Sequence, residues 1–188
     1  MKAPRFFFLG GLLLAGLIPV HTAKADAKLI DFTFIARDTT TGEDSKEREF
    51  DYAFGDWGGG KVNQIRNKGL LINHLGSNGG VGANKRLNLR GTTKIKIEFV
   101  IGNGNVASSF SFSLTDNDGT DCSYTVPLEA KPKGTPISHT FDLNSPTSSE
   151  KPGDKPGLDL KKLKVWQIKG NFQAQPLEVL ISKVTGVK

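Results

Sequence analysis

Hydrophobic and polar residues alternate with a period of two along much of this chain. From residue 94 to 101 the odd positions are hydrophobic, whereas positions 94, 96 and 98 are charged. From 109 to 115 the even positions are Phe or Leu and the odd positions are Ser or Thr. Such alternation is typical of a β-strand with one buried and one solvated face. No stretch of ten or more residues beyond the N-terminal leader has helical periodicity, so these segments predict strands.

Ten short strands are predicted, separated by loops rich in Gly, Pro, Asn and Asp. Their ranges are 29–35, 50–54, 70–75, 85–89, 94–101, 109–115, 124–128, 137–143, 163–169 and 177–184. Short strands at regular spacing favour an antiparallel β-sandwich or barrel. The predicted fold class is therefore all-β, an antiparallel sandwich of the jelly-roll type. A proline-rich stretch at 146–157 is predicted to be a long surface loop within it.

The first 25 residues have the layout of a secretory signal peptide. Lys2 and Arg5 precede an apolar run at 6–20, and the small residues Ala23 and Ala25 stand at positions −3 and −1 before the predicted cleavage site. The run is 15 residues, shorter than the ~20 that span a bilayer, although an uncleaved anchor is the alternative. The sequence predicts cleavage after Ala25, a single domain at 26–188, and a bacterial protein that is secreted or periplasmic. No membrane insertion is expected after cleavage.

The charge balance limits the possible partners, and the cysteine content limits the possible disulfides. Residues 26–188 carry 22 basic and 19 acidic side chains, a net +3, and the basic residues are scattered along the sequence. This balance argues against a nucleic-acid partner. Cys122 is the only cysteine, so no intramolecular disulfide forms, and we expect it to be a small buried residue. The sequence makes no prediction of oligomeric state.

No catalytic constellation is evident. The chain lacks the spaced histidines, the Gly-x-Ser-x-Gly elbow and the Cys-x-x-Cys pair of common catalytic or zinc sites. No strand face carries two acids, so we predict no catalytic residue, no metal ligand and no enzyme. A hydrolase would need two carboxylates on one concave face. The acidic run at 116–121 resembles the start of a calcium loop, but Pro127 stands where the bidentate glutamate belongs. An Asx-rich hairpin turn is the preferred interpretation.

Several motifs together resemble a known family. They are Phe54-Gly55-Asp56-Trp57-Gly58-Gly59, Ser77-Asn78-Gly79-Gly80-Val81-Gly82, Leu114-Thr115-Asp116-Asn117-Asp118-Gly119 and Val165-Trp166-Gln167-Ile168-Lys169-Gly170. The chain resembles the galactose-binding-like β-jelly-rolls of exported bacterial proteins, similar to family 11 and family 30-type carbohydrate-binding modules. The resemblance implies a structural calcium between acids near the first and last strands. Asp31 fits the first, but Lys183 stands on the last strand where an acid is expected, which argues against the ion. No cofactor is predicted.

Sugar binding requires an exposed aromatic ring and polar groups beside it. Trp57, in a glycine-rich loop, is the predicted stacking residue, with capping of the core as its alternative role, while Trp166 is expected in the core. The predicted polar partners are Lys96, Ser111, Tyr124 and Gln167. Lys96, Ser111 and Gln167 would share one continuous polar surface if their strands are neighbours, and Tyr124 would present its hydroxyl from the strand after the hairpin.

Two functions follow from these features. The leading hypothesis is a secreted, non-catalytic carbohydrate-binding domain. The alternative is a protein-interaction or assembly domain of the cell envelope, whose polar face and long 146–157 loop contact another protein. The expected partner is a glycan under the leading hypothesis and an envelope protein under the alternative.

Overall fold

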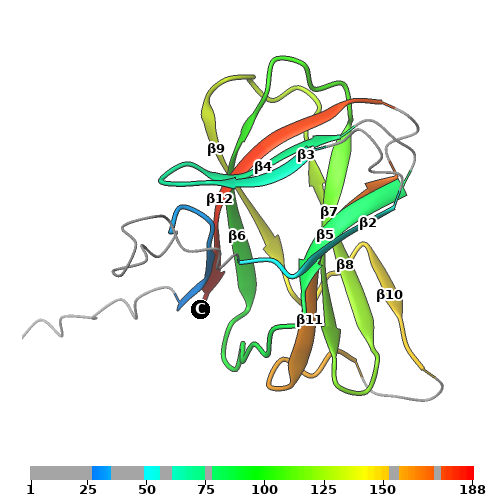
Figure 1. Ribbon diagram of the computed structural model, residues 1–188. Coiled ribbons are helices and arrows are strands. Elements are labelled where there is room, and N and C mark those ends of the chain that lie inside the picture. The colour runs from blue at the N-terminus through cyan, green and yellow to red at the C-terminus, as the bar shows by residue number, and fades with distance from the viewer. Residues whose placement is uncertain (1–26, 35–48, 56–60, 75–77, 153–156, 172–174) are drawn as a thin grey trace, which may run out of the picture.

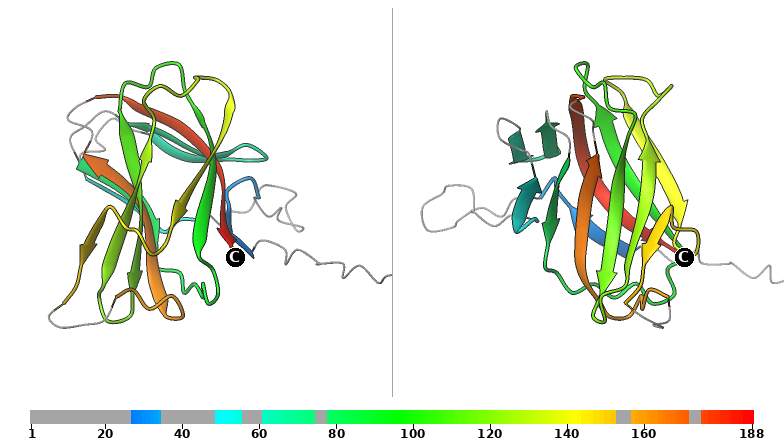
Figure 2. Two further views of the ribbon diagram at one scale, coloured as in Figure 1. Left: turned by 180° about the vertical axis from the view of Figure 1, so that it is seen from behind. Right: turned by 90° about the vertical axis from the view of Figure 1, so that its right-hand side faces the viewer.

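The computed structural model describes residues 27–34, 49–55, 61–74, 78–152, 157–171 and 175–188. Twelve strands form in this part of the chain, without a helix. All of them pair antiparallel, in two sheets that pack face to face (Figures 1 and 2). The all-β sandwich predicted from the alternation is confirmed.

Sheet I has the order β3-β4-β12-β6-β9, and β1 also pairs with β12. The last strand is long enough to pair with β4 along its first half and with β1 along its second half. The strands of sheet I are β1 (Ala27–Asp31), β3 (Lys61–Ile65), β4 (Gly69–His74), β6 (Lys94–Ile101), β9 (Pro136–Asp142) and β12 (Leu177–Val187).

Sheet II has the order β10-β8-β7-β11-β5-β2. Its strands are β2 (Tyr52–Gly55), β5 (Asn78–Ala83), β7 (Ser109–Asp116), β8 (Asp121–Pro127), β10 (Ser148–Glu150) and β11 (Leu163–Asn171). The inward positions of β7 and β11 come from the hydrophobic half of the alternating pattern. These strands therefore carry polar side chains on the outer face of sheet II.

The core lies between the two sheets and is rich in aromatic rings. Phe32 meets Trp166 edge to face at 5.7 Å between ring centroids, and Phe99 of sheet I meets Phe110 of sheet II in the same way at 5.7 Å. Edge-to-face geometry is favoured by the ring quadrupoles. Trp166 is fully buried and Cys122 is buried as well, so both predictions of core residues are confirmed.

Three details of the predicted elements are wrong. The segment 85–89 forms no strand: only Leu87 makes an isolated bridge, to Leu163. The 146–157 stretch is not wholly loop, because its residues Ser148–Glu150 form edge strand β10. Strands β3 and β5 were not predicted, since β5 is dominated by glycine and carries little hydrophobic alternation.

Candidate functional site

The register of sheet II aligns one residue from each of its six strands in a transverse row on the outer face. Neighbouring strands lie ~4.8 Å apart, so five intervals give a row about 24 Å long. From edge to edge this row, called the serine row below, reads Ser148, Ser123, Ser113, Gln167, Gly82 and Tyr52. Ser148, Gln167 and Tyr52 present their hydroxyl and amide groups on the outer face, whereas the other three members are buried: Ser113, Ser123 and Gly82.

A second row runs parallel to it and ends in another aromatic ring. It consists of Thr125, Ser111, Lys169, Gly80 and Phe54. Both rows therefore end on β2 with an aromatic side chain, preceded by a glycine of β5. The face has an aromatic flank on one side and hydroxyl groups on the other.

The aromatic rings of β2 lie over the two glycines. A Cβ at Gly82 would stand 2.8 Å from the Tyr52 hydroxyl oxygen, and one at Gly80 would overlap the Phe54 ring and stand 2.7 Å from the Ile168 carbonyl oxygen. Only glycine leaves room for rings in this position. The ring centroids of Tyr52 and Phe54 are 6.2 Å apart, and Phe54 remains 37% exposed. The pair forms a shallow aromatic platform at the edge of the sheet.

An ion pair crosses the middle of the face. Lys169 Nζ lies 3.0 Å from Asp121 Oδ2, and Asp121 Oδ1 accepts a hydrogen bond from Thr115 Oγ1 at 2.9 Å. Lys169 of β11 is the cross-strand partner of Ser111 on β7, and Asp121 of β8 is the partner of Thr115 on β7. The ion pair therefore crosses over β7 at Ser113, which lies between these two positions. The Ser113 side chain is fully buried, and its hydroxyl has no hydrogen-bond partner among the described residues. A buried hydroxyl without a partner is unusual in native structures.

These features surround a groove of about 390 Å³. Its walls combine the Phe54 ring with polar side chains: Asn78, Ser111, Asp121, Ser123, Ser148, Glu150 and Lys169. Asp121 and Glu150 are direct cross-strand partners, so two carboxylates do share this face. Lys169 neutralises Asp121, which leaves one acidic charge in the groove.

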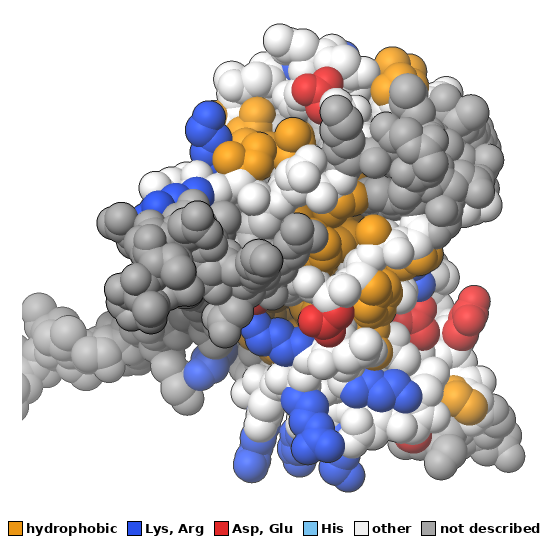
Figure 3. Space-filling view, viewed as in Figure 1, with side chains coloured by type: hydrophobic (Ala, Val, Ile, Leu, Met, Phe, Trp, Pro, Cys, Tyr) orange, Lys and Arg blue, Asp and Glu red, His pale blue; other side chains and the backbone are white. Residues whose placement is uncertain are grey.

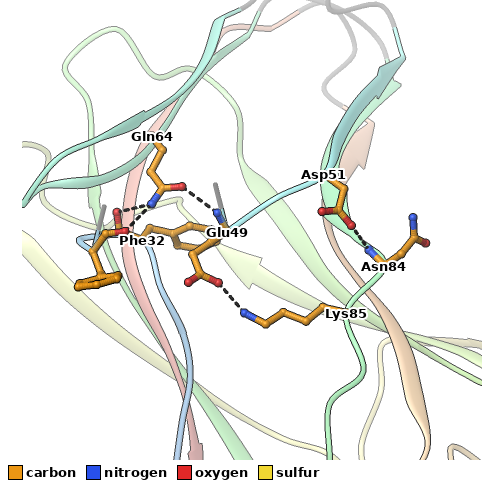
Figure 4. A network of polar contacts seen from close by, with 7 residues as sticks. Phe32, Glu49, Asp51, Gln64, Asn84 and Lys85 are labelled. Atoms are coloured by element: carbon orange, nitrogen blue, oxygen red, sulfur yellow. Dashed lines mark hydrogen bonds and ion pairs between the residues drawn. The ribbon is translucent and has the colours of Figure 1, made fainter. Parts of the chain in front are cut away.

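A polar network anchors the segment that leads into β2 (Figure 4). Gln64 of β3 accepts a hydrogen bond from the Glu49 N–H at 2.9 Å and donates to the Phe32 and Phe34 carbonyl oxygens. On the other side, Lys85 Nζ lies 2.7 Å from Glu49 Oε2. A second link follows from Asp51, whose Oδ2 accepts from the Asn84 N–H at 2.7 Å. The network fixes the entry of the aromatic strand against both sheets.

The structure brings together two of the predicted ligand residues. Ser111 lines the groove, and Gln167 lies in the serine row, where its Nε2 donates to the Tyr52 hydroxyl oxygen at 3.2 Å. Trp57 lies outside the described residues, so its predicted stacking role stays a prediction.

The other two predicted residues lie elsewhere. Lys96 belongs to β6, which pairs with β12 and β9 in sheet I, and its Nζ lies 3.5 Å from Glu98 Oε1. The expected continuous polar surface is therefore wrong, because its strands divide between the two sheets. Tyr124 points into the core, where its hydroxyl donates to the Leu143 carbonyl oxygen at 2.9 Å and burial raises its pKa. Its hydroxyl is not presented to a ligand.

Sequence reasoning missed Tyr52 and Phe54. They are two residues apart in a predicted strand, which puts them on one face. Which face that is depends on pairing with the glycine-rich β5, whose residues are some 30 positions away. The usable signal was the Gly79-Gly80-Val81-Gly82 run, since glycines within a strand mark a close approach of another group.

Local contacts hold the acidic turn at 116–121 and the Asp31 carboxylate. Asp116 is buried, and its Oδ1 accepts from the Asp118 and Thr120 N–H groups at 3.1 and 3.0 Å. This confirms the Asx-rich hairpin turn.

Asp31 is the cross-strand partner of Lys183 and accepts from the Thr33 N–H at 3.0 Å. Within the described ranges no group of three or more His, Cys, Asp or Glu residues could hold a metal ion. No helix in these ranges has the length and apolar character to span a membrane.

No protein-family model matches this chain, and neither does any curated protein. Solved structures do match. The family 11 carbohydrate-binding module of the cellulosomal cellulase Lic26A-Cel5E of Clostridium thermocellum has a TM-score of 0.58 at 15% identity, covering 88% of this chain and 96% of the module. A family 11 module from the same organism, in complex with a β-1,3-1,4-mixed-linked tetrasaccharide, has a TM-score of 0.57 at 13% identity, over 86% and 95%.

A longer enzyme also contains this fold. The agarase AgWH50C matches with a TM-score of 0.57 at 12% identity over 86% of this chain, but this chain spans only 26% of the agarase. At such identities the likenesses establish the fold and no more. The fold is therefore that of the jelly-roll carbohydrate-binding modules, as the resemblance in the sequence implied. This chain matches the two family 11 modules over nearly their whole length.

Proposed function

We propose that this protein binds a carbohydrate chain in the groove on the outer face of sheet II, without cleaving it. The observation that carries the proposal is the aromatic platform of Tyr52 and Phe54 at one end of a row of hydroxyl and amide groups. Aromatic rings pack against the apolar faces of sugar rings, while hydroxyl and amide groups bond the sugar hydroxyls. The serine row runs across the strands, so we propose that the glycan lies across them too.

The jelly-roll likeness supports this proposal. A module of the same fold was solved with a β-1,3-1,4-mixed-linked tetrasaccharide, which makes mixed-linked glucans the natural first probe. The agarase match adds agar oligosaccharides to the panel. Mixed-linked glucans and agar oligosaccharides are both uncharged. They suit this groove because the charges of Lys169 and Asp121 cancel, which leaves the Glu150 carboxylate as its one net charge.

The non-catalytic part of the proposal rests on the two groove carboxylates. Glycoside hydrolysis uses one carboxylic acid as a proton donor and a second carboxylate as base or nucleophile. Here the Asp121 carboxylate forms an ion pair with the Lys169 ammonium and accepts a hydrogen bond from the Thr115 hydroxyl. Both of its oxygens therefore already have partners within the protein. We expect no new reducing ends when the protein is incubated with any glycan that it binds.

Isothermal titration calorimetry with the mixed-linked tetrasaccharide and with agar oligosaccharides tests the binding proposal. Phe54→Ala is expected to weaken binding about tenfold, equivalent to roughly 1.4 kcal/mol. Phe34→Ala is the matched control, because Phe34 is 62% exposed and does not line the groove. Absence of heat across the neutral glycans, or equal affinity of Phe54→Ala and the unaltered protein, contradicts the proposal. A stoichiometric protein that co-purifies and is lost with Phe54→Ala would favour the envelope-assembly alternative.

We also propose that the protein is exported, with cleavage after Ala25. The support is the charged, apolar and small-residue order of residues 1–25, a segment outside the described residues. Expression in a bacterial host followed by mass measurement of the secreted or periplasmic product tests this. A product that retains residues 1–25 contradicts it.

A further inference from the structure

Basic side chains gather at one end of the sandwich, on two segments that lie side by side. Residues 84–91 belong to the connection between β5 and β6, and residues 157–164 comprise the approach to β11 and its first two residues. The Leu87 N–H donates to the Leu163 carbonyl oxygen at 3.2 Å, and the Leu89 N–H donates to the Leu160 carbonyl oxygen at 2.7 Å. Figure 3 shows Lys and Arg side chains clustered at this lower end of the molecule. Segments more than 65 residues apart in sequence thus form one surface.

The charge on these two segments is strongly one-sided. Together they hold six basic residues and one acid, a net +5, whereas residues 26–188 as a whole carry +3. Lys85 is paired with Glu49, which leaves five members, called the basic patch: Arg86, Arg90, Lys161, Lys162 and Lys164. The single acid, Asp159, lies 3.9 Å from Lys162 Nζ. For the other four no ion pair is found within the described part of the chain.

The basic patch offers charge without an exposed apolar surface. Leu89 and Leu163 of the same segments are each 1% exposed, so they hold the segments to the core. Among the described residues, the large hydrophobic side chains that are exposed are Phe34, Phe54 and Val106, and none belongs to either segment. Proteins that bind a bilayer surface usually insert apolar side chains beside their cations. This surface therefore suits a water-dissolved polyanion better than a membrane.

We propose that the basic patch is a second binding site, for an anionic polysaccharide bearing sulfate or carboxylate groups. Arginine guanidinium groups bind oxyanions through paired N–H donors, and lysines add point charges. A polymer repeats its anions along its length, so it can engage cations spread over two segments at once. The site does not depend on the groove, whose lining residues are all different.

Dextran sulfate and uncharged dextran of equal length separate charge recognition from recognition of the sugar. The protein is expected to bind dextran sulfate and not dextran, with an affinity that falls as salt rises, since binding releases counterions. The test variant combines Arg86→Gln, Arg90→Gln and Lys161→Gln. Its affinity should fall at least about tenfold, and the slope of log K against log salt should decrease by up to about three, one for each contact.

The matched control removes the same three charges from elsewhere on the surface. Lys68→Gln, Lys131→Gln and Lys133→Gln remove lysines of the β3–β4 and β8–β9 connections, outside both segments, and this variant should keep its affinity within about twofold if the patch is local. Equal loss in both variants shows that only net charge matters and overturns the proposal. Tighter binding to vesicles of anionic lipid or to duplex DNA than to dextran sulfate, at equal charge concentration, overturns the choice of polysaccharide. Neutral-glycan binding by the test variant reports on the groove separately.

Discussion

Asp116→Asn tests how the β7–β8 turn is held to the segment before β11. The Asp116 carboxylate accepts three backbone hydrogen bonds: two at Oδ1, and one at Oδ2 from the Asp159 N–H at 2.8 Å. Asparagine has nearly the same shape but one acceptor oxygen. It can keep the two bonds to Asp118 and Thr120, while its NH₂ group would face the Asp159 N–H, donor against donor.

The magnitude follows from that count. Losing a hydrogen bond to a charged acceptor costs about 1.5–3 kcal/mol, and the two retained bonds weaken when the charge is lost. We expect the free energy of unfolding to fall by about 3 kcal/mol, or Tm by about 6–12 °C for a domain of this size. Because Asp116 is 1% exposed, water cannot readily replace the lost acceptor.

Urea unfolding followed by tryptophan fluorescence measures this change. Asp142→Asn is the matched control, because Asp142 Oδ1 accepts from the Asn144 N–H at 2.8 Å in an exposed turn and asparagine can make the same bond. The control should change stability by less than about 0.5 kcal/mol. If Asp116→Asn is as mild as Asp142→Asn, the three-bond account of Asp116 is refuted.

Two further predictions concern the platform and the acid side of the stability profile. Gly80→Ala should displace the Phe54 ring and destabilise the protein by about 1–3 kcal/mol, measured by urea unfolding. Gly157→Ala, where a Cβ would meet only the Lys151 Nζ at 4.0 Å, should be neutral or slightly stabilising. Equal effects of the two substitutions would contradict the aromatic platform. Burial, and after it the nearby charge of Lys131, lowers the pKa of His139 in the folded protein. As the pH falls, the His139 imidazole is therefore protonated in the unfolded chain before it is protonated in the folded protein. Stability should therefore decrease below the ordinary histidine pKa of about 6.5. His139→Gln should reduce the stability difference between about pH 7.5 and 5.5, and an unchanged difference would exclude His139 as its source.

The sequence predicts local structure here better than it predicts which strands are neighbours. The alternation at 94–101 and 109–115 correctly gives β6 and β7, including which side of each strand is buried. It cannot give the sheet to which each belongs, because pairing is decided by contacts between distant residues. Lys96 and Ser111 were therefore assigned to one surface although they lie on different sheets.

The same limit explains the misassigned and the missed site residues. Tyr124 has a polar tip, but its position in β8 points inward, next to the Phe141 ring at 4.6 Å between centroids. Tyr52 and Phe54 look like ordinary strand residues until the glycines opposite them are known. The basic patch has the same origin, since its two segments are scattered in sequence and adjacent in space. Long-range register, which the alternation does not encode, determines each of these features.

The serine row has a consequence for cooperativity between folding and binding. It takes one residue from every strand of sheet II, from Tyr52 to Gln167 in sequence, so it exists only when all six strands are paired. A glycan along that row would contact its exposed members on both edge strands, β10 and β2, and on the central strand β11, and so would hold the sheet together across its width. Any opening of the sheet would then have to release the ligand first. At a ligand concentration about 100 times Kd, this linkage adds about 2.7 kcal/mol to the free energy of unfolding, and it would protect all six strands alike from hydrogen exchange.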